Sequence, residues 1–484
     1  MKAFAQRAID VARSGGASYA DVRILETQEQ LISTQNGEVE TLLSTDSVGM
    51  GVRAIVNGGW GFAACHKITR ESVEKTARQA VTVAKASALV RTGEVRLAPL
   101  EGMVDTWNSP CERDPFKVSL ESKLDLLMKV DQALRAIQGV TLAKASLLFV
   151  RTKKLFLNSQ GSCIEQSFYQ MGGGFTAYSF QNGELQKRSY PNSFGGQHQL
   201  GGYEVIERMH FLDHAPRVAE EAVALHKAEQ CPRRKTTLIL ESSQLALQIH
   251  ESIGHPIELD RVLGFEANYA GTSFLTLDTL GQLRYASPVV NVVADARLSH
   301  GPGLGTFGYD DEGVPAQRVD IIREGLFVGY LTSRETAAIL GQKQSNGAMR
   351  ADGWNHIPLI RMTNISLLPG NWRLEDLIAD TRDGIYMETN RSWPIDDKRY
   401  HFQFGTEIAW EIKKGKKTRM LKNPSYGGIT TQFWNSCDAV CGKSNWELWG
   451  LPNCGKGQPG QVIGTGHGAA PARFRDVEVG MAYI

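Results

Sequence analysis

The sequence predicts an α+β protein, with an N-terminal half of antiparallel sheets that carry helices and a β-rich C-terminal half. Three observations predict this. Helical periodicity and strand-like runs follow one another twice before residue 231. Beyond about residue 255 nearly every segment is typical of short strands and turns. The 484 residues, 42% of them hydrophobic and 22% charged, contain enough apolar material for the cores of two or three domains.

The first hundred residues predict a sheet with helices packed on it. Residues 3–14 repeat their apolar side chains at helical spacing, and we expect Gly15-Gly16 to end this helix. Residues 18–67 are strand-like, and the dipeptides Asn36-Gly37 and Asn57-Gly58 favour tight turns between antiparallel strands. Thr69 can cap the helix that follows.

The same order recurs in the next segment. Residues 97–115 contain three prolines and few periodic apolar positions, which is typical of a linker. We then expect a helix from Leu120 to Ile137, strands from Val140 to about Tyr203, and a helix from Pro216 to Glu229. Gly172-Gly173-Gly174 lies among the strands and indicates a bend rather than a phosphate-binding loop.

The polar segment CPRRK, residues 231–235, is the best candidate for a domain boundary. We therefore expect an N-terminal α+β domain over residues 1–231, with a sub-boundary near 97–115. A C-terminal β-rich domain over 235–484 would follow.

Within the C-terminal half, Ser242 or Ser243 can cap a helix that runs to about His255. Two charged runs are expected to be structural. The acids of Asp310-Asp311-Glu312 should bond local backbone at a strand end. Lys413 to Lys417 should form the exposed tip of a hairpin.

Composition and charge exclude several classes of function. Lys and Arg number 53 and Asp and Glu 52, so a net charge of +1 draws the chain neither to nucleic acid nor to an anionic membrane. The charges at Lys2, Arg7 and Asp10 exclude a secretory signal peptide, and no apolar run is long enough to span a membrane. We expect a cytoplasmic protein with seven reduced cysteines and no nucleotide-binding loop.

The strongest functional signal is His250-Glu251-Ser252-Ile253-Gly254-His255, in which two imidazoles flank a carboxylate. Zinc hydrolases carry His-Glu-x-x-His, whose spacing leaves the two rings about 40° apart on one helix face. Here the spacing gives about 140°, so one metal can take both rings only if the helix widens into a π-turn or ends between them. Gly254 weakens the helix, and Pro256 is expected to push His255 out of α-helical geometry.

These residues suit a zinc hydrolase. Neutral imidazoles bind Zn²⁺, and Glu251 can act as the general base. A catalytic zinc generally takes a third protein ligand, and spacing does not choose among the candidates. Cys454 lies in a glycine-flanked loop, where Lys456 could lower the pKa of its thiol. Cys437 and Cys441 give only a weak indication of a second, structural zinc. The candidates are Glu258, Asp260, Glu266, His300, His356, His401, His467, Cys437, Cys441 and Cys454.

Several segments occur in the order known from one protein family. They are GASYADVR (16–23), NGEVE (36–40), GMGVRAIVNGGWGFAA (49–64), HESIGH (250–255), GTFGYDDEGVPAQ (305–317), GLFVGYLTSRETA (325–337), RMTN (361–364), PG (369–370) and CGKGQP (454–459). Together they cover nearly the whole chain. The chain resembles the TldD/PmbA (TldD/TldE) modulator-of-gyrase metallopeptidases, specifically their TldD-like catalytic branch.

The resemblance implies one zinc per chain, bound by His250, His255 and Cys454, with Glu251 as the catalytic carboxylate. It also implies an active site enclosed by dimerisation, either with a second copy or with a family partner that lacks the motif. Residues 255–274 and the segment Trp434 to Trp449 depart from the family. Because both flank proposed site residues, they leave substrate choice open.

The sequence thus predicts a zinc-dependent peptidase for unfolded or small peptides, which would bind by strand addition. The alternatives are a zinc amidohydrolase for non-peptide amides and a non-catalytic scaffold for a partner peptidase. The intact set of His250, Glu251 and His255 argues against the scaffold. The pattern does not choose between exopeptidase and endopeptidase action, or between homodimer and heterodimer.

Overall fold

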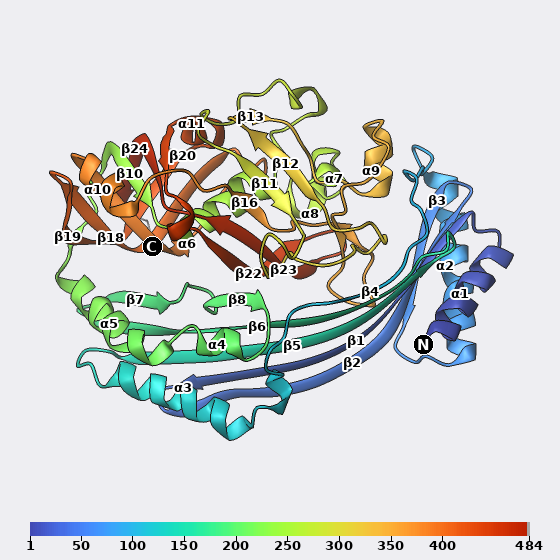
Figure 1. Cartoon of the computed structure of the whole chain (residues 1–484), viewed down its shortest axis with the longest axis horizontal. Coiled ribbons are helices and arrows are strands. Elements are labelled where there is room, and N and C mark those ends of the chain that lie inside the picture. The colour runs from blue at the N-terminus through green and yellow to red at the C-terminus, as the bar shows by residue number, and fades with distance from the viewer. Residues whose placement is uncertain (482–484) are drawn as a thin grey trace.

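The computed structural model describes residues 1–481 and confirms the α+β class. A long curved antiparallel sheet, built by about the first two hundred residues, lies beneath a β-rich C-terminal part (Figure 1). None of the helices within the described residues is long and apolar enough to cross a membrane.

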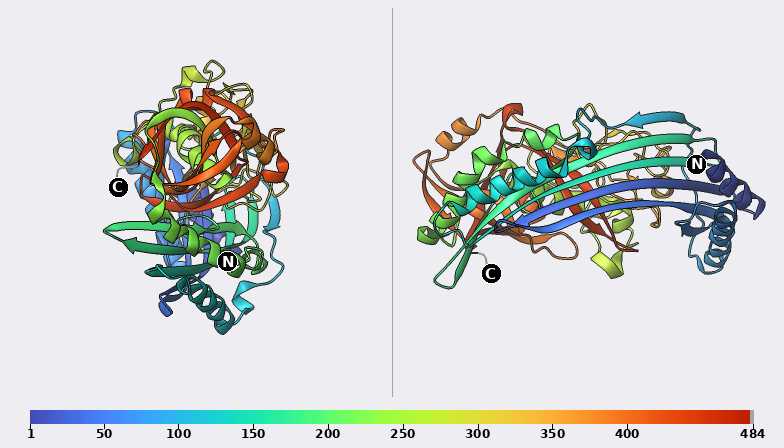
Figure 2. Two further views of the ribbon diagram at one scale, coloured as in Figure 1. Left: turned by 90° about the vertical axis from the view of Figure 1, so that its left-hand side faces the viewer. Right: turned by 90° about the horizontal axis from the view of Figure 1, so that it is seen from below.

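The N-terminal strands form one sheet in the order β3-β2-β1-β5-β6-β4, and β7 and β8 pair with β6. The two strand blocks of the sequence are joined because β1 pairs with β5 from Asp21↔Asn158 to Gln35↔Lys144. Figure 2 shows these blue and green strands running side by side. The strands are β1 (Tyr19–Gln35), β2 (Glu38–Val56), β3 (Gly59–Cys65), β4 (Val104–Asn108), β5 (Leu142–Asn158), β6 (Cys163–Gln181), β7 (Glu184–Tyr190) and β8 (Gln197–Leu200).

Helices pack at both ends of this sheet and give it two apolar cores. One core lies under α1 and α2, and the other under α3 and α5 (Figure 1). Thr69 caps α2 as expected, since its side chain accepts from the Ser72 N–H at 3.3 Å. The turns at Asn36-Gly37 and Asn57-Gly58 also form, with all four residues at positive φ. The helices are α1 (Lys2–Ser14), α2 (Arg70–Val90), α3 (Leu120–Arg135), α4 (Glu204–Glu207) and α5 (Phe211–Ala224).

Two N-terminal segments differ from the sequence expectation. The expected linker 97–115 contains β4, which pairs in parallel with β6 from Val104↔Cys163 onward. Helix α5 begins at Phe211, five residues before Pro216, and ends at Ala224. The expectation that Pro216 marks the start of the helix was wrong, because this proline lies inside α5, beyond the first turn in which proline is usually found.

The C-terminal part contains a closed barrel in the order β17-β10-β24-β20-β18, in which β18 also pairs with β17. Strands β19 and β9 extend it, and β21 pairs with β24. The hairpin of β18 and β19 has its tip at Lys414-Gly415, as expected. The strands are β9 (Glu229–Gln230), β10 (Arg234–Leu240), β17 (Asp383–Ser392), β18 (His401–Lys413), β19 (Lys416–Lys422), β20 (Pro424–Ile429), β21 (Cys437–Val440) and β24 (Ala472–Met481).

Smaller sheets and short helices surround the barrel. Helix α6 is buried along its whole length and contacts β16, β17, β22 and β23, so it is fixed in the C-terminal core. The remaining elements are β11 (Val292–Asp295), β12 (Arg318–Arg323), β13 (Leu326–Phe327), β14 (Met349–Arg350), β15 (Leu359–Ile360), β16 (Ile365–Leu367), β22 (Glu447–Lys456), β23 (Gln461–Ala469), α6 (Ser242–Ile249), α7 (Leu259–Val262), α8 (Ala267–Ala270), α9 (Arg334–Ile339), α10 (Leu374–Asp380) and α11 (Thr430–Asn435).

The acidic run 310–312 joins the two parts of the chain. Asp310 accepts from the backbone N–H groups of Glu312 and Val314 at 2.9 Å, as expected. Its two neighbours instead form buried ion pairs with the N-terminal sheet: Asp311 lies 2.6 Å from Lys154, and Glu312 lies 3.5 Å from Arg53. The local interpretation was therefore incomplete, because these partners lie far away in the sequence.

Candidate metal centre

The motif helix begins one or two residues earlier than expected, because its cap is Glu241 and not Ser242 or Ser243, and it widens where the histidines lie. Glu241 is the N-cap of α6, and its carboxylate accepts from the Ser243 N–H at 2.8 Å. From His250 to Gly254 the backbone forms a π-helical turn, in which the His255 N–H donates to the His250 carbonyl at 3.1 Å. The predicted loosening of the helix is confirmed.

This extra residue in the turn brings the two imidazoles together, with ring centroids 4.9 Å apart. His255 keeps α-helical dihedrals, φ −65° and ψ −43°, so the expectation that Pro256 would displace it was wrong. The widened turn alone returns the second ring to the first. Gly254 has a packing role as well, since a Cβ atom there would lie 2.1 Å from the sulfur of Met362.

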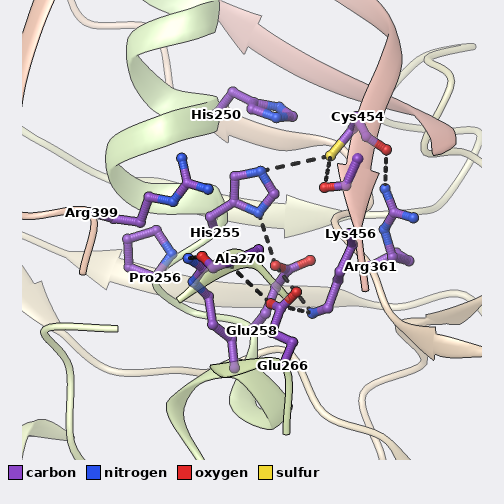
Figure 3. A network of polar contacts seen from close by, with 12 residues as sticks. His250, His255, Pro256, Glu258, Glu266, Ala270, Arg361, Arg399, Cys454 and Lys456 are labelled. Atoms are coloured by element: carbon purple, nitrogen blue, oxygen red, sulfur yellow. Dashed lines mark hydrogen bonds and ion pairs between the residues drawn. The ribbon is translucent and has the colours of Figure 1, made fainter. Parts of the chain in front are cut away.

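Cys454 reaches the histidines from strand β22. Its Sγ lies 3.8 Å from Nε2 of His255, and the donor atoms of His250, His255 and Cys454 all lie within 4.8 Å of one another (Figure 3). Two ligands of one tetrahedral Zn²⁺, with bonds of about 2.0–2.3 Å, are about 3.6 Å apart. All three side chains are buried. The donor set and its spacing therefore fit a zinc ion.

The hydrogen bonds of His250 leave its Nε2 free to bind a metal. Nδ1 of His467 faces the carbonyl oxygen of Ile365 at 3.2 Å and must donate to it, because a carbonyl only accepts. Nε2 of His467 is then an acceptor, and Nδ1 of His250 donates to it at 2.8 Å. Burial lowers the pKa of His467 well below its ordinary value, which keeps that imidazole neutral.

A carboxylate orients the ring of His255 in the way that His467 orients the ring of His250. Its Nδ1 donates to Glu258 at 3.0 Å, so the lone pair of Nε2 faces Cys454. Glu258 in turn lies 3.2 Å from Nζ of Lys456, a fully buried ammonium that also lies 2.8 Å from Asp260 and 3.6 Å from Glu266 (Figure 3). These three carboxylates raise the pKa of Lys456 against the lowering effect of its burial.

The charges around Cys454 favour its thiolate. Burial by itself raises the pKa of Cys454, but His255 and Arg361 together outweigh burial and lower it. Lys456 does not have the role that the sequence suggested, because its ammonium faces the carboxylates. Arg361 also donates to the backbone carbonyl of Cys454, which fixes this part of β22. Burial lowers the pKa of His255 well below its ordinary value and keeps it a neutral donor.

Glu251 lies beside this group on the wall of a cavity of about 290 Å³. Its Oε2 accepts from Nη1 of Arg399 at 2.6 Å. Arg399 lies in the connection between β17 and β18 and was missed in the sequence, where nothing near it signals a link to residue 251. The carboxylate of Glu251 is therefore held next to His250, His255 and Cys454 but is not one of the three potential metal ligands.

The other predicted ligand candidates have different partners. Glu258 and His467 orient the histidines, and Asp260 and Glu266 surround Lys456. Within residues 1–481 no second group of three potential ligands includes Cys437 or Cys441. Of the remaining histidines, His300 bonds Ser366, His356 pairs with Asp352, and His401 is exposed.

Models of one protein family match three segments of the chain. Domain 1 of the PmbA/TldA metallopeptidases matches residues 20–84, the central domain matches 113–228, and the C-terminal domain matches 233–480. The chain belongs to the PmbA/TldA metallopeptidase family. The His250, His255 and Cys454 group is consistent with the TldD branch of this family.

Curated relatives of this PmbA/TldA chain are similar over almost their whole length. A metalloprotease of Methanocaldococcus jannaschii is 30% identical over 93% of this chain and 95% of its own. A metalloprotease TldD homolog of Haemophilus influenzae is 26% identical, with 97% and 94% covered. A zinc metalloprotease TldD homolog of Saccharolobus solfataricus is 22% identical, with 98% of both chains covered.

Solved structures share the fold of this PmbA/TldA chain. TldE from Thermococcus kodakarensis superimposes with a TM-score of 0.72 at 15% identity, over 99% of this chain and 100% of its own. A Thermotoga maritima protein, described as a candidate modulator of a DNA gyrase, gives a TM-score of 0.77 at 16% identity, over 99% of both chains.

Proposed function

We propose that this chain is a zinc-dependent peptidase that hydrolyses unfolded or short peptides. The observation that carries the proposal is the convergence of two imidazoles and a thiol beside Glu251 on one cavity wall. Zinc accepts this set of nitrogen and sulfur donors and leaves a position for substrate. The zinc metalloprotease of Saccharolobus solfataricus among the relatives supports the choice of metal.

His250, His255 and Cys454 would hold one zinc per chain. Bound there, zinc supplies a Lewis acid that polarises a scissile carbonyl and makes water more acidic. Glu251 takes a proton from the attacking water and returns it to the leaving amine. Arg399 holds the carboxylate of Glu251 at the cavity wall through their contact of 2.6 Å. Glu258 and His467 keep the imidazole lone pairs directed at the ion.

An extended peptide can bind beside β22. Within the described chain, β22 pairs with β23 in a two-stranded sheet, and Leu451 and Asn453 to Gly455 line the cavity. The backbone of a peptide lying along this segment could bond to it as an added strand, which requires an unfolded substrate.

We also propose that the chain works as a dimer, with a second copy or a family partner. Strand β2 pairs with β1 along one edge, and β3 pairs with the other edge only from Met50 onward. The edge that faces away from β1 therefore has no strand partner over residues 38–49 among the described residues. Apolar side chains are exposed along it, which suits an interface. They are Val39, Leu42, Leu43 and Val48. Light scattering that gives a monomer with full peptidase activity would contradict this.

The decisive experiment compares the wild type with Glu251→Gln. Elemental analysis should find about one zinc per chain in both, because Glu251 is not a ligand. Peptide hydrolysis should fall about 10²–10⁴-fold in the variant, the usual cost of losing a general base. A zinc-loaded wild type that hydrolyses non-peptide amides and leaves peptides intact would be an amidohydrolase. A chain that binds no zinc and hydrolyses neither substrate would be a scaffold.

A further inference from the structure

Part of the lining of the metal-site cavity is apolar and comes from both halves of the chain. Phe194 comes from the loop between β7 and β8, and Trp393 follows the end of β17. Their rings meet edge to face with centroids 4.6 Å apart, and Leu247 and Leu451 also line the cavity. The same cavity is also lined by His250, His255, Cys454, Glu251 and Arg399.

Glycines allow the loop that carries Phe194 to lie very close to the N-terminal sheet. A Cβ at Gly196 would lie 1.9 Å from the carbonyl oxygen of Gly173, and one at Gly174 would lie 2.6 Å from Cα of Gly196. A Cβ at Gly172 would lie 2.1 Å from the ring of His198. Gly172 to Gly174 lie inside strand β6, which pairs with β5 without a break in register, so the structure shows no turn at the bend that the sequence indicated. The triple glycine instead permits close contact with the loop.

The backbone is strained where it presents Phe194. Phe194 has a φ of +55°, and the two glycines after it also have positive φ. Such a conformation is costly for a bulky residue and persists only where the surroundings enforce it. Nζ of Lys187 lies 5.2 Å from the ring of Phe194 and 3.5 Å from Glu407 of the barrel, so the ring also contacts a cation that is paired with the barrel.

The same loop is attached to the strand that carries Cys454. The side-chain amide of Gln197 donates to the carbonyl of Leu448 at 2.9 Å and accepts from the N–H of Gly450 at 2.8 Å. These two hydrogen bonds fix the position of the Phe194 loop relative to β22, where Leu451 and Cys454 line the cavity. Phe194 is 41% exposed, so much of its ring is available to a ligand.

We propose that Phe194 and Trp393 form a subsite that takes an apolar side chain of the peptide residue bound next to the metal. This inference rests on the proposed peptidase function and adds a substrate class to it. Burial of an apolar side chain against two aromatic rings is favourable, whereas the rings offer no hydrogen-bond partner that would replace the lost hydration of a charged side chain. The N-terminal half, which contributes none of the three metal ligands, would thereby select substrates.

The test uses acetylated and amidated alanine peptides that carry one central Phe, Asp or Lys. Zinc-loaded wild type should cleave beside the Phe with a kcat/KM at least about 10-fold above that for Asp or Lys. Phe194→Ala and Trp393→Ala should bring these ratios close to one with unchanged zinc content, and Phe194→Leu should retain part of them. Leu89→Ala, on an exposed position of α2, is the matched control and should keep the wild-type ratios.

A binding measurement separates this inference from the peptidase proposal. Fluorescence anisotropy on zinc-loaded Glu251→Gln should show the same preference for the Phe peptide, and the additional change Phe194→Ala should remove it. Preferential binding without any cleavage by the wild type would uphold the subsite and overturn the peptidase. Equal binding and cleavage of all three peptides, or ratios that survive both aromatic substitutions, would overturn the subsite.

Discussion

Nδ1 of His250 lies 2.8 Å from Nε2 of His467, although 217 positions of the chain separate the two residues. The contact fixes which nitrogen of His250 carries the proton, since the other ring nitrogen of His467 is committed to a carbonyl. Groups of this kind orient metal-binding imidazoles and raise their affinity. We therefore propose that His467 is a positioning residue of the metal centre.

We predict that His467→Ala lowers zinc affinity about 10–100-fold, because His250 loses the acceptor that orients its ring. Competition with a chromogenic chelator measures this directly. His401→Ala, which removes an exposed histidine of β18, should leave the affinity unchanged. Wild-type affinity in His467→Ala would show that the contact is incidental.

Cys454→Ser should weaken zinc binding sharply, because it removes the thiolate from the donor set. Cobalt gives an independent measurement, since a thiolate ligand produces a charge-transfer band in the near ultraviolet. The band should be present in the wild type and in Cys437→Ser and absent in Cys454→Ser. If it persists without Cys454, the sulfur ligand lies elsewhere.

Lys456→Met should destabilise the fold by about 3–5 kcal/mol near neutral pH, the usual cost of leaving buried charges without a partner. Asp260 and Glu266 already have raised pKa values because of burial, and the loss of the ammonium raises them further. A raised carboxyl pKa gives stability that is present at low pH and lost as pH rises, so the loss should be smaller near pH 5. Urea unfolding at both pH values checks this, with the exposed Lys85→Met as control.

His198 should make the fold sensitive to acid. Burial lowers its pKa from 6.5 to about 4, so the unfolded chain takes up the proton more readily than the folded one. Its contribution to stability is complete above about pH 6.5 and lost as pH falls toward 4, about 3 kcal/mol in all. Unfolding of metal-free wild type and His198→Gln at about pH 7.5 and about pH 4.5 should give a smaller pH effect in the variant. Equal pH effects would contradict the assignment.

Local signals predicted the features that depend on neighbouring residues. The five-residue spacing of His250 and His255, with Gly254 between them, predicted that the helix widens into a π-turn or ends between them, because no regular helix joins two such rings on one metal. The structure has the π-turn. The Asn-Gly turns of the N-terminal sheet were also predicted from local sequence, because few residues adopt positive φ without strain.

The sequence could not reveal contacts between distant segments. The pairing of β1 with β5 has no local signature, and it unites what were two separate strand blocks. Cys454 was one ligand candidate among many until the family resemblance singled it out. The contact of Arg399 with Glu251 spans 148 positions and follows no motif.

The domain boundary at residues 231–235 stays a prediction. Strand β9 ends at Gln230 and β10 begins at Arg234, so a short connection separates them. We propose that residues 1–231 and 235–484 are distinct domains, which limited proteolysis would test through fragments of those lengths.

The long separation of the ligands has a consequence during protein synthesis. A ribosome completes His250 and His255 about two hundred residues before it reaches Cys454, and it reaches His467 later still. A nascent or prematurely released chain that ends before Cys454 lacks the thiolate and the β22–β23 hairpin. Assembly of the proposed centre thus depends on nearly complete translation, because an unfinished chain lacks the full set of donor side chains.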